Sequence, residues 1–337
     1  MLFRKPYGID LGSSTIKVYS STKNKSYMTK NLIAHRGREI IAVGNEAYEM
    51  FEKTPASVQV EMPMTFGMIA NVELEEISLY QMLRQIDPKS HRGGEVFFSV
   101  PMDTTAIEKN AYYRCVNGKW LRNNKVFLVE EPIADAIALG IPLEKNKGSM
   151  IVNLGAQSTS FSVIAEGKVI ISRKVPIGGC QMNEAICNEI RKHYNLSIGT
   201  RTAKRLKTAI GRMHSDQPTA RKIVGIDSLS GLPREEAISS EVVGEGLEDC
   251  LREIGREMKS FLERTPPQIA ARIAYKGIYL TGGSSRIPDI QTYLEEATGY
   301  TYKLSGLYEL SIIKGLERII REPELRKWAA QLKPRKL

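Results

Sequence analysis

The chain has 337 residues, which is too long for one simple core and suits about two domains. Hydrophobic residues make up 42% of it and charged residues 26%, as in a soluble globular protein. No apolar stretch reaches the length of a membrane span and no signal-peptide core is evident, so we expect a cytoplasmic protein. The net charge of +10 favours an anionic partner, but no aromatic residues accompany the basic ones, so we expect no nucleic acid partner.

The four cysteines are scattered along the chain without a CxxC pair. Cys180 and Cys187 are seven residues apart in a helical pattern, so we expect them to share a buried face rather than to bind a metal. This usage is typical of a reducing compartment.

The first half of the sequence alternates predicted strands and helices, which indicates βαβ units and a largely parallel sheet. Asn71, followed by the acids Glu73, Glu75 and Glu76, marks one helix start. Strands are expected at residues 16–19, 27–28, 31–35, 40–43, 95–100 and 125–129, and helices at 44–51, 74–86, 104–115 and 133–139.

The second half repeats the order of the first, beginning again with a strand, a turn and a meander. The sequence therefore predicts a structural duplication, with a ligand in the cleft between the halves. Strands are expected at residues 150–154, 160–165, 169–174 and 277–280, helices at 182–194, 202–211 and 242–263, a short helix after Pro266-Pro267, and an extended stretch at 220–240.

Two strand-then-turn segments are the most informative motifs. Residues 7–15 (YGIDLGSST) and 151–159 (IVNLGAQST) each run an apolar strand into an acid or amide, a glycine and small hydroxyl residues. Such turns offer backbone N–H and hydroxyl donors at close range, which suits a phosphate chain. Two of them would hold a nucleotide's phosphates from both sides.

Four further segments have a recognisable order and spacing. They are residues 128–137 (LVEEPIADAI), 198–203 (IGTRTA), 225–233 (GIDSLSGLP) and 262–267 (LERTPP). With the two turns they resemble the actin-like ATPases and, within that group, the bacterial cytoskeletal MreB family, from about Tyr7 to about Arg321.

This resemblance implies an α/β, actin-like ATPase fold of two duplicated α/β domains with a nucleotide cleft between them. The implied limits are residues 1–143 for domain I with a small subdomain at 33–65, 144–305 for domain II with a small subdomain at 182–245, 306–321 for a return to domain I, and 322–337 for a basic amphipathic tail.

The resemblance also assigns roles around the first turn. Asp10 would hold Mg²⁺ through waters, because that ion prefers to keep its hydration shell. Ser13, Ser14 and Thr15 would donate to phosphate. Lys17 stands where actin carries a phosphate-binding lysine, although an exposed strand lysine is the alternative.

The catalytic positions implied by the family are Glu131, which would orient the attacking water, and Asn153. The family has an aspartate at the second position, and an amide neither attracts Mg²⁺ nor takes a proton. The family usually has two glycines here, which let the backbone approach phosphate closely. In this chain Ala156 and Gln157 replace them. We therefore expect a slow ATPase at most.

The remaining nucleotide contacts implied by the family lie in the second half. Lys204 stands where the family commonly carries a glutamate, so the preference for ATP over GTP stays undecided. Arg286 could stack on the base or be solvated. The full set is Gly155, Ala156, Gln157, Ser158, Lys204, Lys207, Gly282, Gly283, Ser284 and Ser285.

Both ends of the sequence offer candidate membrane contacts. Met1-Leu2-Phe3-Arg4-Lys5 is a small apolar and basic anchor. Leu325, Trp328, Ala329 and Leu332 would share one face of a basic tail helix, which suits an anionic lipid surface, an acidic partner, or packing through Trp328.

The resemblance thus implies a cytoskeletal protein that binds ATP and Mg²⁺ and polymerises with itself into filaments. The filaments would lie at the inner face of the cell membrane and organise cell-wall synthesis and rod shape, with MreB paralogues and cell-wall synthesis proteins as partners. The alternative is a catalytically silent scaffold that copolymerises with an active paralogue. A small-molecule kinase is disfavoured, because no acidic catalytic base is evident in a sugar-binding region.

Overall fold

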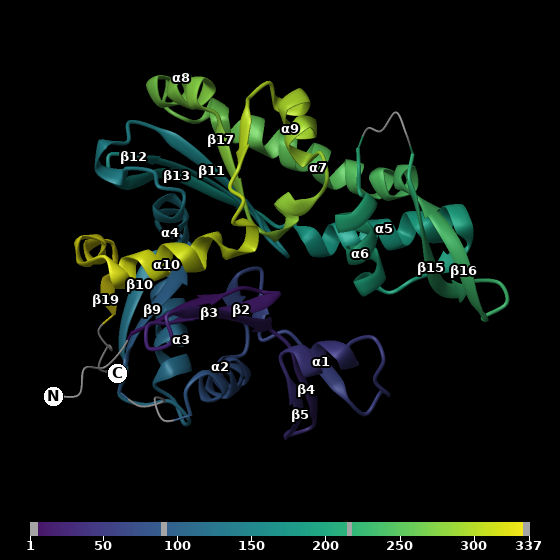
Figure 1. The fold of residues 1–337 in the computed structure, drawn as a ribbon, viewed down its shortest axis with the longest axis horizontal. Helices are drawn as coiled ribbons and strands as arrows, with labels where there is room; N and C mark the ends of the chain where they lie inside the picture. The colour runs from purple at the N-terminus through teal and green to yellow at the C-terminus, as the bar shows by residue number, and fades with distance from the viewer. Residues whose placement is uncertain (1–5, 89–92, 214–217, 333–337) are drawn as a thin grey trace. The chain divides into compact units, whose positions relative to one another are not determined.

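The structure is a computed structural model that describes residues 6–88, 93–213 and 218–332. The chain divides into two compact units, Met1–Pro142 with Leu310–Leu337 (unit 1) and Leu143–Glu309 (unit 2). Both units are mixed α/β structures (Figure 1). The expected N-terminal anchor at residues 1–5 lies outside the described residues.

Unit 1 is built on a six-stranded sheet with the order β19-β10-β9-β1-β2-β3. β1 pairs antiparallel with β2 and parallel with β9, and β9 runs parallel to β10. The strands are β1 (Tyr7–Leu11), β2 (Thr15–Ser20), β3 (Lys25–Lys30), β9 (Glu95–Val100), β10 (Lys125–Glu130) and β19 (Ala330–Leu332).

Helices cover both faces of this sheet, because alternate residues of each strand point to opposite sides. Ile9 packs with α2 (Val72–Ile86) and α3 (Ala106–Val116) in one buried core. On the other face, Gly8 lies against α10 (Ser311–Arg321), which in turn packs on α4 (Glu131–Ala138).

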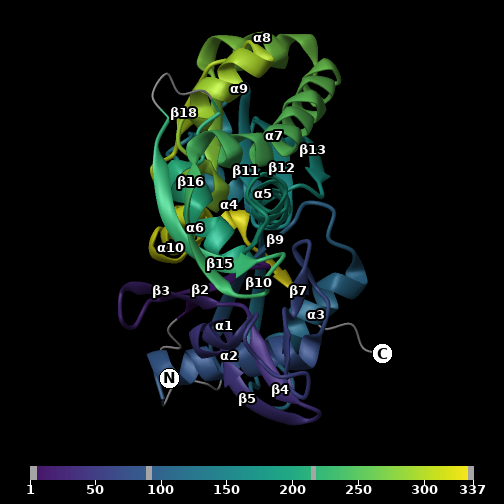
Figure 2. The same ribbon diagram turned by 90° about the vertical axis from the view of Figure 1, so that its right-hand side faces the viewer.

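A smaller sheet of unit 1 has a core of its own. β4 (Ile33–Arg36) lies between β5 (Glu39–Val43) and β6 (Gln59–Glu61), and Figure 2 shows β4 and β5 beside α1 (Asn45–Met50). Next along the chain comes the short hairpin of β7 (Met64–Thr65) and β8 (Met68–Ile69).

Unit 2 repeats the central sheet, with the order β13-β12-β11-β17-β18. This order and these strand directions match those of β3-β2-β1-β9-β10, which confirms the predicted duplication. The strands are β11 (Ser149–Leu154), β12 (Thr159–Ala165), β13 (Lys168–Val175), β17 (Ile278–Thr281) and β18 (Tyr302–Leu304).

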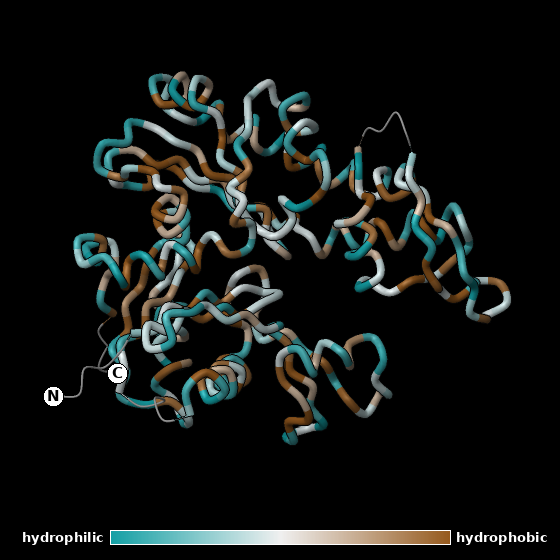
Figure 3. Tube along the Cα trace, viewed as in Figure 1, coloured by the Kyte–Doolittle hydropathy of each residue, from teal (hydrophilic) through white to brown (hydrophobic). Residues whose placement is uncertain are grey.

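The helices of unit 2 pack with its sheets around one large buried core. In Figure 3 the hydrophobic residues of both units follow the central strands and the inward sides of the helices. The elements are α5 (Gly179–Tyr194), α6 (Thr200–Ile210), α7 (Ser240–Glu263), α8 (Pro267–Lys276), α9 (Ile290–Thr298) and a three-stranded sheet of β14 (Leu196–Ser197), β15 (Ala220–Asp227) and β16 (Pro233–Ser239).

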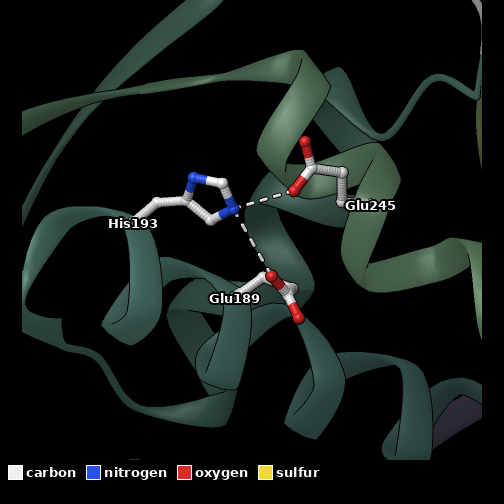
Figure 4. Close-up of side chains that lie close together, drawn as sticks. All are labelled: Glu189, His193 and Glu245. Carbon is white, nitrogen blue, oxygen red and sulfur yellow. Dashed lines mark ion pairs between the residues drawn. The ribbon is translucent and has the colours of Figure 1, made fainter.

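Ion pairs on the surface join α5 to α7. The Nε2 atom of His193 lies 2.8 Å from a carboxylate oxygen of Glu245 and 3.5 Å from one of Glu189 (Figure 4). All three side chains are partly exposed, so we interpret the group as a surface ion-pair network.

The predicted tail helix is wrong for the described residues. The chain forms a 3-10 helix at Pro323–Trp328 and then β19, which pairs antiparallel with β10. Leu332 packs on the core of unit 1, and Arg326 lies over the Phe97 ring at 5.5 Å. Pairing with β10 satisfies backbone groups that an open sheet edge would leave exposed. The helical spacing of apolar residues in the sequence contains no information about this pairing.

No helix within the described residues is both long and apolar enough to cross a lipid bilayer. Cys187 is buried as predicted, whereas Cys180 is only partly buried.

Candidate functional site

Hydrogen bonds within the turn and from neighbouring segments hold the turn between β1 and β2. The Gly12 N–H donates to the Thr15 carbonyl at 3.0 Å, which closes the turn. Asn31 makes two hydrogen bonds to the turn. Its backbone N–H donates to the Ser14 carbonyl and its Nδ2 donates to the Gly12 carbonyl, both at 3.1 Å. Ser13 accepts a bond from the Gly67 N–H at 3.0 Å. The conformation of the predicted phosphate turn is therefore fixed by four hydrogen bonds.

A buried ion pair lies at the base of this turn. Asp10 and Lys17 face each other across β1 and β2, with Lys17 Nζ 2.7 Å from Asp10 Oδ2. Ser99 Oγ donates to Asp10 Oδ1 at 3.0 Å. Lys17 is 6% exposed, so the alternative of an exposed strand lysine is wrong. Sequence reasoning missed Ser99, whose signal is a lone hydroxyl near the end of an apolar strand.

Behind the turn lies a second buried carboxyl, that of Glu75 on α2. Its Oε2 accepts from Asn31 Nδ2 at 3.1 Å, and the side chain is fully buried. Burial raises the pKa of Glu75 to about 8, although the bond from Asn31 opposes this shift. The sequence suggested only a helix-start acid here, yet Glu75 shares helical spacing with the buried Leu79 and Met82.

Glu131 is the first residue of α4, directly before Pro132, and is partly buried. Burial raises the pKa of the Tyr112 hydroxyl well above its usual value, and the carboxyls of Glu131, Glu75 and Asp10 raise it further. These three acidic groups of unit 1 therefore all act electrostatically on one buried tyrosine.

The turn between β11 and β12 in unit 2 has the same closing bond as the first. The Gly155 N–H donates to the Ser158 carbonyl at 3.0 Å. The start of α5 docks on this turn, since the Gly179 N–H donates to the Gly155 carbonyl at 3.0 Å. A Cβ built on Gly178 would lie 2.6 Å from the Ser158 nitrogen, so only glycine fits there. Sequence reasoning missed this glycine pair, although two glycines before a helix are a visible signal.

Four of the predicted nucleotide contacts follow β17 in residues 281–285, called here the 281–285 turn, which lie directly beside the second phosphate turn and run into a 3-10 helix at Gly283–Arg286. Ser284 Oγ donates to the Gly155 carbonyl at 3.1 Å. Gly282 has φ +86° and approaches Asn153 so closely that an added Cβ would lie 2.6 Å from its Oδ1. Asn153 lies opposite Ser160 in its hairpin, as Asp10 lies opposite Lys17 in the first one. Asn153 thus corresponds to Asp10, and Ser160 to Lys17.

Lys207 belongs to the same group. It is 3% exposed, and its Nζ donates to the Gly179 carbonyl at 2.7 Å. Burial lowers its pKa to about 7, and the neighbouring Lys204, which is partly buried, lowers it too. Arg286 is different, because it bonds to Glu309 at 2.8 and 3.2 Å and lies 4.1 Å over the ring of Tyr308.

The candidate residues thus divide between the two units, and the contacts described above join most of those within each unit. Unit 1 holds Asp10, Ser13, Ser14, Thr15, Lys17 and Glu131, and unit 2 holds Asn153, Gly155, Ala156, Gln157, Ser158, Lys204, Lys207, Gly282, Gly283, Ser284 and Ser285.

These residues fit the implied Mg²⁺ poorly. Proteins hold this ion through one or two carboxylates and its waters. Lys17 neutralises Asp10, Ser99 occupies its second oxygen, and the equivalent residue of unit 2, Asn153, carries no charge. The expected role of Asp10 as a metal residue therefore lacks support from its surroundings.

The duplicated sheets with their paired turns define an actin-like protein, which confirms the predicted fold class. The MamK double helical filament protein shares this fold, with a TM-score of 0.76 at 19% identity over 95% of this chain and 99% of that chain. MreB5 of Spiroplasma citri bound to AMPPNP gives a TM-score of 0.88 at 28% identity, over 96% of this chain and 97% of that chain.

The chain belongs to the MreB/Mbl protein family, whose pattern matches residues 4–327. The cell shape-determining protein MreB of Escherichia coli K12 is 31% identical over 307 residues, 88% of each chain. The cell shape-determining protein Mbl of Bacillus cereus is 30% identical over 302 residues, 88% of this chain and 89% of that protein.

Proposed function

We propose that the chain is a cell shape-determining protein that binds ATP and polymerises with itself into filaments. The observation that carries the proposal is the pair of turns with the same closing bond, Gly12 to Thr15 and Gly155 to Ser158. Relatives support it, since MreB5 of Spiroplasma citri has been crystallised with AMPPNP and with ADP, and MamK forms a double helical filament.

In this proposal the hydroxyl and backbone donors of both turns bind the phosphates. The residues of the 281–285 turn, with Lys204 and Lys207, serve the sugar and base side. The filaments lie at the inner face of the cell membrane and organise cell-wall synthesis and rod shape, together with MreB paralogues and cell-wall synthesis proteins. The excess of positive charge in the chain suits such an anionic surface.

Sedimentation tests nucleotide-gated assembly. We expect the purified protein to pellet as filaments with ATP, and to stay in the supernatant after enzymatic removal of nucleotide. Ser14→Asp places a negative charge in the first turn, where it repels phosphate, so we expect it to lose pelleting with ATP. The matched control is Thr22→Asp, in an exposed turn of the same unit, which should pellet as the parent protein does. Equal pelleting with and without nucleotide would contradict the proposal.

The second candidate function is a scaffold that binds nucleotide without hydrolysing it, and Asn153 favours it. An amide cannot accept the proton that a carboxylate accepts from an attacking water. We expect Asn153→Asp to release phosphate at least about tenfold faster than the parent, within the range of one acid–base group. Phosphate release measured on preformed filaments is the readout. An unchanged rate would show that the amide does not limit hydrolysis.

A further inference from the structure

The base of the first turn carries a positive charge of its own, and this bears on which form of nucleotide the protein takes. We propose that the chain binds its nucleotide without needing a divalent cation, with the Lys17 ammonium in place of that cation. The inference rests on the proposed nucleotide binding and adds the ionic form of the ligand.

The Lys17 ammonium lies close to the first turn. Lys17 is buried on β2, and its Nζ lies 2.7 Å from Asp10 Oδ2. A Cβ built on Gly12 would lie 3.8 Å from this Nζ, so the charge is beside the backbone of the turn. An ammonium has three N–H donors and the contact with Asp10 uses one of them. A phosphate oxygen at the turn can therefore take another.

Asp10 already has a hydrogen-bond donor on each of its carboxylate oxygens. Its two oxygens accept from Lys17 Nζ and from Ser99 Oγ, at 2.7 and 3.0 Å. The Asp10–Lys17 pair has no net charge, so it attracts a divalent cation less strongly than a lone carboxylate would. Lys17 therefore keeps N–H donors for phosphate, whereas the neutralised Asp10 adds little attraction for a metal ion.

The equivalent hairpin position in unit 2 has no charged side chain. Asn153 faces Ser160 there, at the same hairpin position as Asp10 and Lys17, and neither side chain is charged. Both hairpins thus lack the net negative charge with which proteins hold Mg²⁺.

The test compares nucleotide affinity with and without metal, by titrating a fluorescent ATP analogue in buffer with Mg²⁺ or with EDTA. We expect the Kd of the parent protein to differ by less than about threefold between the two buffers. A loss of tenfold or more in EDTA would overturn the inference. Failure to bind in both buffers would overturn the proposed function as well, so the two failures are distinguishable.

Two variants locate the effect. Lys17→Met combined with Asp10→Asn removes both charges at nearly constant volume, and we expect it to lose at least about tenfold in affinity in EDTA. Asn153→Asp adds a carboxylate to unit 2, and we expect it to acquire a Mg²⁺ dependence of about tenfold. Thermal unfolding verifies that both variants are folded. Lys23→Met, which removes a charge from an exposed turn, is the matched control and should bind as the parent does. Parent-like affinity of the double variant in EDTA would contradict the role of Lys17.

Discussion

Glu75→Gln is expected to stabilise the protein increasingly as the pH rises from about 4.5 to about 8. The folded state keeps the buried carboxyl protonated up to a pKa of about 8, whereas the unfolded chain releases the proton near the ordinary value of 4.5. Between these values the unfolded state binds fewer protons, so the free energy of unfolding of the parent falls with rising pH. Above a pH of about 8 this loss is complete.

The glutamine keeps an oxygen that can accept from Asn31 and has no proton to lose. We therefore expect the free energy of unfolding of the variant to exceed that of the parent by roughly 3–5 kcal/mol at pH 8, and by little at pH 4.5. Urea unfolding at several pH values measures the difference. The matched control is Glu73→Gln, an exposed position on the same helix, which should show no such growth. A constant difference across this pH range would contradict the proposed burial effect.

Gly282→Ala is expected to destabilise unit 2 by about 3 kcal/mol or more, from backbone strain and overpacking together. Gly282 has φ +86°, which alanine rarely adopts, and an added Cβ would contact the Leu154 carbonyl and lie 2.6 Å from Asn153 Oδ1. The chain can relieve this overlap only by separating the 281–285 turn from β11. We therefore expect weaker nucleotide binding as well.

Gly283→Ala is the matched control for that variant. A Cβ there would meet Glu309 Cβ at 3.6 Å, an ordinary contact. We expect it to change stability by less than about 0.5 kcal/mol. Urea unfolding compares the stability of the two variants, and titration of the fluorescent analogue compares Gly282→Ala with the parent protein. Equal stability of the two variants would mean that the close approach at Gly282 is not needed.

The sequence predicted those features of the fold that depend on neighbouring residues. Strands that end in a polar residue, a glycine and small hydroxyl residues are local patterns, and β1, β2, β11 and β12 lie where they were expected. The repeat of these patterns also predicted the duplicated sheet order. The stretch after residue 286 gave no prediction of α9 or β18, and the tail helix was wrong because pairing with β10 is a long-range interaction.

The sequence predicted the residues of the two turns, but it did not predict the residues that support them. Asn31 bonds to the first turn, Glu75 bonds to Asn31, and Ser99 bonds to Asp10. No spacing in the sequence connects these three supporting residues. The sequence left open for the same reason whether Lys17 is buried or exposed. A lysine in a strand is exposed or buried according to what lies across the sheet, and here Asp10 lies beside it.

The position of β19 has a practical consequence for handling the protein. The family match ends at residue 327, which makes that point an obvious place to shorten the chain, yet the cut would remove Ala330–Leu332 from the margin of the sheet. The main-chain groups of Val126 and Leu128 would then be open to another molecule, and uncontrolled association could be mistaken for ordered assembly. Tags and reporter fusions are best attached beyond Leu337 through a spacer.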